Sequence, residues 1–177
     1  DDGFYTKDSL KLCIEKHEKE NLGHKDIVIV RHVEGRNHGG HQEPNDFWRA
    51  WHHPPLRLSG IPQDFYIILN GMMKLDYLRD LGGFDCIYEN YNMNLHDLAF
   101  RAQRAGSKMY FSPTTCLNCD WNPNEGDHVP ITSAHNEHDM PLFTKLMSEP
   151  QEDRIKIDIF NWTKSAPVWK RRFGDKK

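Results

Sequence analysis

Apolar residues recur with two different spacings along the first thirty positions, and these spacings predict a helix followed by a strand. Over residues 8–20 the apolar positions repeat every three or four residues, as on one face of a helix. Asp8 is placed to cap the start of this helix, and Gly23 is placed to end it. Residues 27–30 then form a continuous β-branched run, which is typical of a buried strand. The expected buried face of the helix consists of Leu10, Cys13, Ile14 and His17.

The alternation of strands and helices continues through the middle of the chain. Residues 65–69 predict a second buried strand, and residues 74–81 predict a short helix. A longer helix is expected from Asn94 to Gly106, where the glycine stops it. Residues 108–111 predict a third strand. The buried face of the longer helix is expected to contain Leu95, Leu98, Ala99 and Ala102.

Two long stretches, residues 34–63 and 112–138, show neither spacing. Both are polar and contain histidines, so we expect functional loops there. Asp139 followed by Pro141 predicts another helix start. Isoleucines alternate with polar residues over 155–159, as in a half-exposed strand. Strands that alternate with helices predict an α/β domain.

Composition narrows the classes of partner. The 177 residues are enough for one domain with a sizeable core, and the net charge of −3 gives no general attraction to nucleic acid. No apolar run approaches the roughly 20 residues that a transmembrane helix needs. Positive charge is concentrated in the tail, residues 164–177, with KRRFGDKK at its end. This tail is either an exposed basic segment anchored by Trp169 and Phe173 or a place where Arg171 and Arg172 meet a diphosphate.

Four cysteines are too few and too scattered for a disulfide framework, which favours a reduced, cytoplasmic setting. Cys116 and Cys119 form a single C-x-x-C. Half a structural zinc site, a redox pair and two plain cysteines all remain open for this motif.

An ordered series of short motifs carries a family resemblance. It consists of Leu81-Gly82-Gly83-Phe84-Asp85, Asp97-Leu98 with Arg101, Ala105-Gly106 and Ser112-Pro113. In this order the motifs resemble the acceptor-side half of A-type glycosyltransferases, especially the inverting family 2 type. The resemblance implies an α/β glycosyltransferase A-type fold, present in part. It also implies transfer of a sugar, with inversion, from a nucleotide-diphospho-sugar to a glycan or other hydroxyl acceptor.

The resemblance assigns substrate-binding residues on the acceptor side. Gly82 and Gly83 would let the acceptor approach the backbone closely. Asp85 and Arg101 would contact substrate, and Trp121 would stack on a sugar face or simply pack.

The start of the chain, Asp1-Asp2-Gly3, resembles the end of the Asp-x-Asp motif in these enzymes. Asp1 and Asp2 would then hold Mn²⁺ or Mg²⁺, because hard cations prefer carboxylate oxygens. His128 is the candidate that completes this metal site, with His135 and His138 as alternatives. Two other interpretations of the first residues stay open: a nucleoside-contacting Asp-Asp-Gly element and an exposed terminus.

If the metal assignment holds, residues 1–177 form a single glycosyltransferase-like domain that lacks the amino-terminal nucleotide-binding half. The chain would then be part of a longer enzyme, and this part alone would not need to be active.

The candidate base departs from the family pattern. Where the family has Glu-Asp, this chain has Asn94-Leu95, and leucine accepts no proton. His96 is the substitute, because an imidazole takes up a proton near neutral pH. Asp97 would orient His96 or hold acceptor hydroxyls. The alternative is an exposed i,i+4 ion pair between Asp97 and Arg101 beside a solvated His96.

Two further functions remain as alternatives. One is a catalytically degenerate glycosyltransferase-like domain that binds a glycan or a partner, which the loss of the Glu-Asp pair favours. The other is a metallohydrolase, suggested by the eleven histidines. It ranks last, because no H-x-H or H-x-x-x-H pair stands on a predicted helix.

Overall fold

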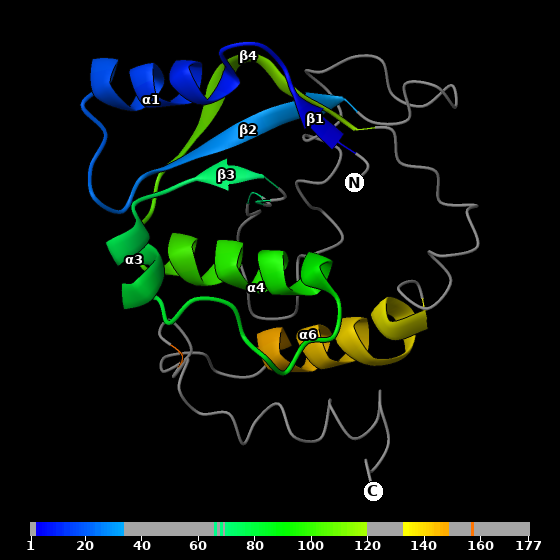
Figure 1. Cartoon of the computed structure of the whole chain (residues 1–177). Helices are drawn as coiled ribbons and strands as arrows, with labels where there is room; N and C mark the ends of the chain where they lie inside the picture. The colour runs from blue at the N-terminus through cyan, green and yellow to red at the C-terminus, as the bar shows by residue number, and fades with distance from the viewer. Residues whose placement is uncertain are drawn as a thin grey trace, which may run out of the picture.

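The described part of the chain is built on a curled, mixed four-stranded sheet (Figure 1). The computed structural model describes residues 3–33, 66, 68, 70–119, 133–148 and 157. The strand order is β1-β4-β2-β3, with β2 and β4 parallel and the other two pairs antiparallel. The strands are β1 (Gly3–Tyr5), β2 (Ile27–Val33), β3 (Gly71–Met72) and β4 (Met109–Cys119).

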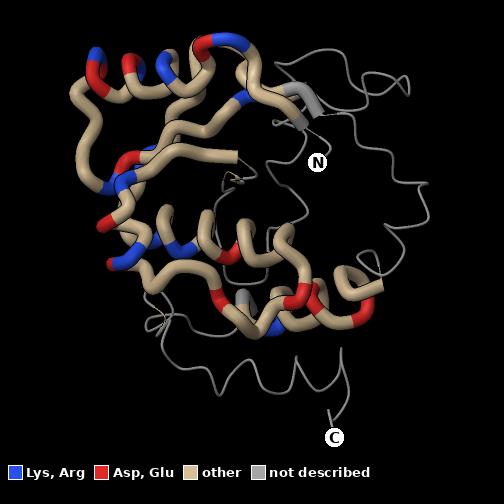
Figure 2. Tube along the Cα trace, in the orientation of Figure 1, with Lys and Arg blue, Asp and Glu red and all other residues tan. Residues whose placement is uncertain are grey.

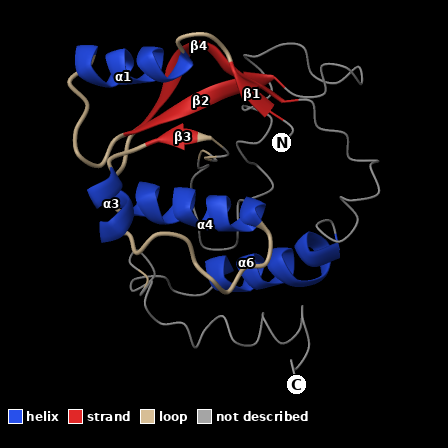
Figure 3. Cartoon of the chain, viewed as in Figure 1, coloured by secondary structure: helices blue, strands red, loops and turns tan. Residues whose placement is uncertain are grey.

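Helices cover both faces of this sheet, which confirms the expected α/β class (Figure 3). One helix, α1, lies on one face, α3 and α4 lie on the other, and α6 lies beyond α4. The helices are α1 (Ser9–Lys19), α3 (Leu75–Asp80), α4 (Tyr91–Arg104), the π-helix η2 (His135–Asp139) and α6 (Met140–Ser148). Within the described ranges, every helix is too short or too polar to span a lipid bilayer.

Strand β2 is buried on both faces, which explains its unbroken apolar run. Val28 and Val30 pack with Cys13 of α1, whereas Ile27 packs with Leu98 of α4 on the opposite face. A strand covered on both sides needs apolar residues at successive positions. The buried strand predicted at residues 27–30 is therefore confirmed.

Three of the described helices end in the same way, with a left-handed residue just beyond the last turn. These residues are Asn21 after α1, Gly82 after α3 and Gly106 after α4, with φ angles of 49°, 83° and 91°. Two backbone hydrogen bonds close each end in a Schellman motif. The predicted stop at Gly106 is confirmed. Gly23 is not the stop of α1, because Asn21 supplies the left-handed residue two positions earlier.

Helix α1 turns a different face to the sheet than its spacing predicts. Ser9 and Cys13 are its buried residues, whereas Leu10 and Ile14 are 60% and 48% exposed. The predicted burial of Leu10 and Ile14 is wrong, because the sheet-facing stripe is centred one residue earlier. Asp8 occupies the N-cap position with φ of 62°, and its side chain makes no capping hydrogen bond.

The predicted strand at residues 65–69 is not formed at Tyr66 or Ile68, although Ile68 is buried. The side-chain amide of Gln103 accepts from the Tyr66 N–H at 2.9 Å and donates to the Tyr66 carbonyl at 2.8 Å. A side chain therefore replaces a strand partner at Tyr66. Among the described residues that follow, Gly71 and Met72 join the sheet as β3.

Strand β4 continues eight residues beyond the predicted end at Phe111, through Pro113 to Cys119. Its register with β2 shifts between Ile29 and Arg31, which pair with Phe111 and Thr115. Proline is tolerated at such an irregularity because it has no N–H to donate. The hydroxyl of Ser112 accepts from the Arg31 N–H at 2.9 Å and so satisfies this donor.

Other predicted boundaries also move. Helix α4 begins at Tyr91, three residues before the predicted start, because Asn90 caps it by accepting from the Asn92 N–H at 2.8 Å. The predicted loop 112–138 is wrong at both ends, which are strand and helix. Of the predicted strand at 155–159, the structure describes only Ile157, which is buried and lies outside any strand.

Candidate functional site

The Leu81–Asp85 motif forms the turn between α3 and α4. Gly82 and Gly83 both have positive φ, 83° and 72°. At Gly82 a side chain would also collide with neighbouring backbone, since a Cβ atom there would lie 1.9 Å from the Ile157 carbonyl oxygen. The pair of glycines is therefore required by chain geometry. The close approach observed at Gly82 is that of Ile157.

Arg101 joins the motifs of the resemblance into one unit. Its Nε donates to the Asp97 carboxylate at 2.7 Å. Its Nη1 and Nη2 donate to the carbonyls of Leu81 and Gly83, each at 2.6 Å. The guanidinium and the carboxylate are both completely buried. One planar fork thus fixes the turn against α4.

Asp97 is a buried partner of Arg101 in this arrangement. The predicted i,i+4 pair is present, but it is buried where the alternative expected an exposed pair. A carboxylate that is sealed in this way does not meet an acceptor hydroxyl unless the turn opens. The catalytic assignment of Asp97 remains a prediction, and the contact that the structure shows is with Arg101.

His96 lies between α4 and α6. It is 3% exposed, and its Nδ1 donates to the Asn92 carbonyl at 2.5 Å. Its ring meets the Phe143 ring edge to face, with 6.2 Å between centroids. The alternative of a solvated His96 is wrong. Its assignment as a base remains a prediction that requires a route for the proton.

Asp85 is also buried, at 3% exposure. Its side chain accepts from the Ile87 N–H at 3.2 Å, and its own N–H donates to the Asn94 side chain at 2.8 Å. Asn94 therefore holds the loop at a position where the family has glutamate. The substrate contact predicted for Asp85 remains a prediction.

Of the predicted residues, the structure brings together Gly82, Gly83, Asp97 and Arg101. Asp1, Asp2, Trp121 and His128 lie outside the described residues. Among the residues that are described, no three His, Cys, Asp or Glu side chains converge to hold a metal ion.

The described backbone does bring together the strand ends from which the predicted metal residues continue. Gly3 pairs with Cys119, and Val33 pairs with Asn118, at the carboxyl ends of the parallel strands β2 and β4. In α/β sheets, ligands bind beside this end of the strands. Asp2 directly precedes Gly3 in the sequence, and Trp121 follows Cys119 by two residues.

The sequence did not predict a cluster of charged residues that lies at the start of α4. Asp139 is completely buried and accepts from the N–H groups of Glu89 at 3.0 Å and Asn90 at 2.6 Å. His138 Nδ1 lies 2.7 Å from Asp139 and 3.8 Å from the Glu89 carboxylate. These residues lie fifty positions apart, so only the α4–η2 contact reveals the cluster. Its sequence signal, Asp139 near Pro141, indicated no more than a helix start.

His135 borders the same cluster from the π-helix. Its Nδ1 is buried and has no hydrogen-bond partner among the described residues. Burial lowers the pKa of His135, and the nearby Asp139 carboxylate opposes this shift in part. His135 is therefore biased toward the neutral form.

The C-x-x-C motif lies on β4. Cys116 is buried in the core between α1 and the sheet, with Cys13 in the same cluster. Burial and the neighbouring Cys116 raise the pKa of the Cys13 thiol to about 11. The Cys13 thiol is therefore held in the protonated, unreactive form.

Comparisons with known proteins add no assignment, since no protein-family model, curated protein or solved structure matches this chain.

Proposed function

We propose that this chain is the acceptor-side part of a metal-dependent glycosyltransferase with an A-type fold. The enzyme would move a sugar from a nucleotide-diphospho-sugar to a hydroxyl acceptor. The observation that carries the proposal is the Arg101 contact set. Arg101 ties Leu81 and Gly83 to Asp97, so motifs that the resemblance identifies about twenty residues apart form one hydrogen-bonded unit.

On the acceptor side, Arg101 and Asp97 act as positioning residues. They fix the Gly82-Gly83 turn, which presents backbone and the neighbouring Asp85 loop to the acceptor. His96 would take the acceptor proton when the contact between α4 and α6 loosens. Direct displacement with inversion follows from the resemblance.

On the donor side, Asp1 and Asp2 would hold Mn²⁺ or Mg²⁺, with His128 as the third ligand. Two carboxylates and an imidazole form a donor set that suits Mn²⁺. The position of Gly3 beside Cys119, at the carboxyl ends of the parallel strands, fits a ligand site there. When bound, the cation would neutralise charge on the leaving nucleoside diphosphate.

The test is a calorimetric titration of the chain with uridine diphosphate, with and without Mn²⁺. We expect binding that needs Mn²⁺ and that Asp2→Ala and His128→Ala each abolish. Asp8→Asn is the control for loss of a carboxylate, because the Asp8 side chain is exposed and makes no capping bond, and asparagine accepts the left-handed φ of 62° at this position. Binding that is unchanged in Asp2→Ala and His128→Ala would refute the metal assignment.

A glycan-binding or partner-binding domain without transferase activity is the second candidate. The complete burial of Asp97 and the presence of Leu95 in place of a carboxylate favour it. It predicts binding of a glycan or a partner without transfer or hydrolysis of a nucleotide-sugar. Measurable turnover that is lost in His96→Gln would exclude it.

A further inference from the structure

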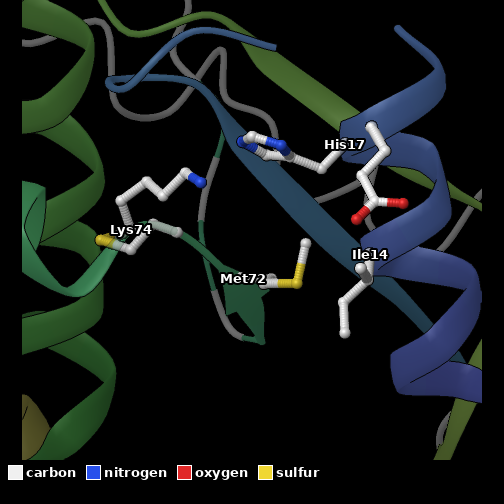
Figure 4. Close-up of a pocket in the computed structure, with 6 residues that line it drawn as sticks. Ile14, His17, Met72 and Lys74 are labelled. Atoms are coloured by element: carbon white, nitrogen blue, oxygen red, sulfur yellow. The ribbon is translucent and has the colours of Figure 1, made fainter. Parts of the chain in front are cut away.

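A hollow of about 180 Å³ lies between α1 and the edge of the sheet (Figure 4). It adjoins β3, the last strand of the described sheet on this side, where Met72 pairs with Val28 of β2. None of the residues assigned above to sugar transfer lines it. The lining residues are Ile14, His17, Glu18, Met72, Met73 and Lys74.

The polar side chains of this hollow have no partners among the described residues. The Nε2 atom of His17 is buried and makes no hydrogen bond within the part of the chain that the structure describes. The side chains of Glu18 and Lys74 are exposed, and in the described part of the chain neither makes a hydrogen bond or an ion pair. Figure 4 shows the His17 ring and the Lys74 amine pointing toward one another beside the hollow. An unsatisfied buried nitrogen is costly, so a ligand that bonds to it is favoured.

The other charged residues of α1 form ion pairs, in contrast to His17 and Glu18 at the hollow. Charges of both signs follow one another along the helix (Figure 2). Glu15 lies 3.9 Å from Lys11 and 3.4 Å from Lys19, and Glu20 pairs with Lys16. His17 and Glu18 stand apart from these pairs at the hollow.

The remaining wall is apolar and adaptable. Ile14 leaves 48% of its surface exposed, and Met72 and Met73 are half-buried. Methionine side chains adjust to ligands of different shape. The volume slightly exceeds that of a cavity of about 150 Å³ that accepts a benzene-sized molecule. The hollow thus offers one ammonium, one carboxylate, one imidazole and an apolar wall.

We propose that this hollow binds a free α-amino acid with an apolar side chain. Lys74 and His17 would bind its carboxylate, and Glu18 would bind its ammonium group. Ile14 and Met72 would cover its side chain. A zwitterion fits because a simple anion leaves Glu18 unpaired and a simple amine leaves Lys74 unpaired.

The test is a titration of the isotope-labelled chain followed by two-dimensional NMR, with L-leucine as the probe. We expect saturable shifts of the His17, Met72 and Lys74 signals at millimolar ligand, the range open to a molecule of this size. Two analogues of leucine each lack one charged group: 4-methylpentanoate has no ammonium, and 3-methylbutylamine has no carboxylate. Each should bind at least about tenfold more weakly, because each loses a charge-assisted hydrogen bond.

Variants locate the binding in this hollow. Lys74→Met and Glu18→Gln should each weaken leucine binding by about tenfold. Lys19→Met is the matched control on α1, because Lys19 pairs with Glu15 and does not line the hollow, and it should bind leucine normally. Thermal melting checks that each variant is folded. The proposal is overturned if leucine gives no saturable shifts or if one of the two analogues binds as well as leucine. It is also overturned if Lys19→Met loses as much affinity as Lys74→Met.

Discussion

The Arg101–Asp97 pair on α4 and the His17, Glu18 and Lys74 side chains at the hollow are both groups of polar and charged residues, but their surroundings differ. Arg101 and Asp97 are 0% exposed, and three hydrogen bonds of 2.6–2.7 Å hold the guanidinium. The side chains at the hollow are partly or largely exposed and have no described partner. Each buried charge of the pair needs the other, because a single buried charge is costly, whereas the charges at the hollow are available to a ligand.

The largest effect is expected for Arg101→Met. This change leaves the Asp97 carboxylate buried without a counter-charge and removes the donors to Leu81 and Gly83. Loss of one partner of a buried pair costs about 3–5 kcal/mol of unfolding free energy. Urea unfolding followed by circular dichroism measures this loss.

Arg104→Met on the same helix is its control. Arg104 is exposed and lies over the Phe100 ring, with its guanidinium carbon 5.5 Å from the ring centroid. Its removal should cost less than about 1 kcal/mol. Equal losses for Arg101→Met and Arg104→Met would contradict the scaffold role of Arg101.

The next largest loss of stability is expected at Gly82, and it can be compared with the loss at Gly106, because each glycine directly follows the C-cap residue of a helix. Gly82→Ala and Gly106→Ala both place alanine at a left-handed φ, which costs about 1–2 kcal/mol. Of these two glycines, only Gly82 would bring the new Cβ against described backbone, the Ile157 carbonyl oxygen. At Gly106 no described atom lies within 4 Å. Gly82→Ala should therefore be the more destabilising change, by about 2 kcal/mol or more in urea unfolding. Equal losses would show that Ile157 does not pack against the turn.

A smaller, pH-dependent effect is expected from His135. Burial lowers its pKa in the folded state, so the unfolded chain takes up the proton first as the pH falls. Stability should therefore decrease as the pH falls from about 7.5 to 5.5, through the ordinary histidine pKa of about 6.5. His135→Gln should flatten this part of the profile, measured as urea midpoints at several pH values. A profile that keeps the slope of the parent chain would assign the pH dependence to other groups.

The smallest effect is expected at the hollow. Lys74→Met removes an exposed charge without a described partner, so the unfolding free energy should change by no more than about 0.5 kcal/mol. The melting temperature of the Lys74→Met variant, compared with that of the parent chain, measures this change. A loss well above 1 kcal/mol would reveal a partner for Lys74 and would weaken the contrast with Arg101.

Local signals in the sequence predicted local features well. The strand at Ile27–Val30 and the stop at Gly106 depend on neighbouring residues, and both are confirmed. The spacing of Asp97 and Arg101 predicted their pair, but its burial depends on the carbonyls of Leu81 and Gly83, which lie 20 and 18 residues before Arg101 in the chain. Such burial cannot be inferred from the spacing on one helix.

Features that depend on pairing between distant segments were missed. Residues 112–119 were predicted to lie in a loop, whereas β4 continues through Pro113 with a shifted register opposite Arg31. His17 was assigned to the buried face of α1 by its spacing. Among the described residues its Nε2 atom has no hydrogen-bond partner, and the segment that faces it contains Met72 and Met73.

The repeated helix ends have a consequence for how the chain folds. Each stop after α1, α3 and α4 closes through bonds that join residues three to five positions apart. Contacts of such short range form within microseconds and carry little loop-closure entropy. We therefore expect the ends of these three helices to be set early, before the sheet pairs β2 with the distant β4. The slow step of folding is then expected to be the assembly of helices that already have their final length.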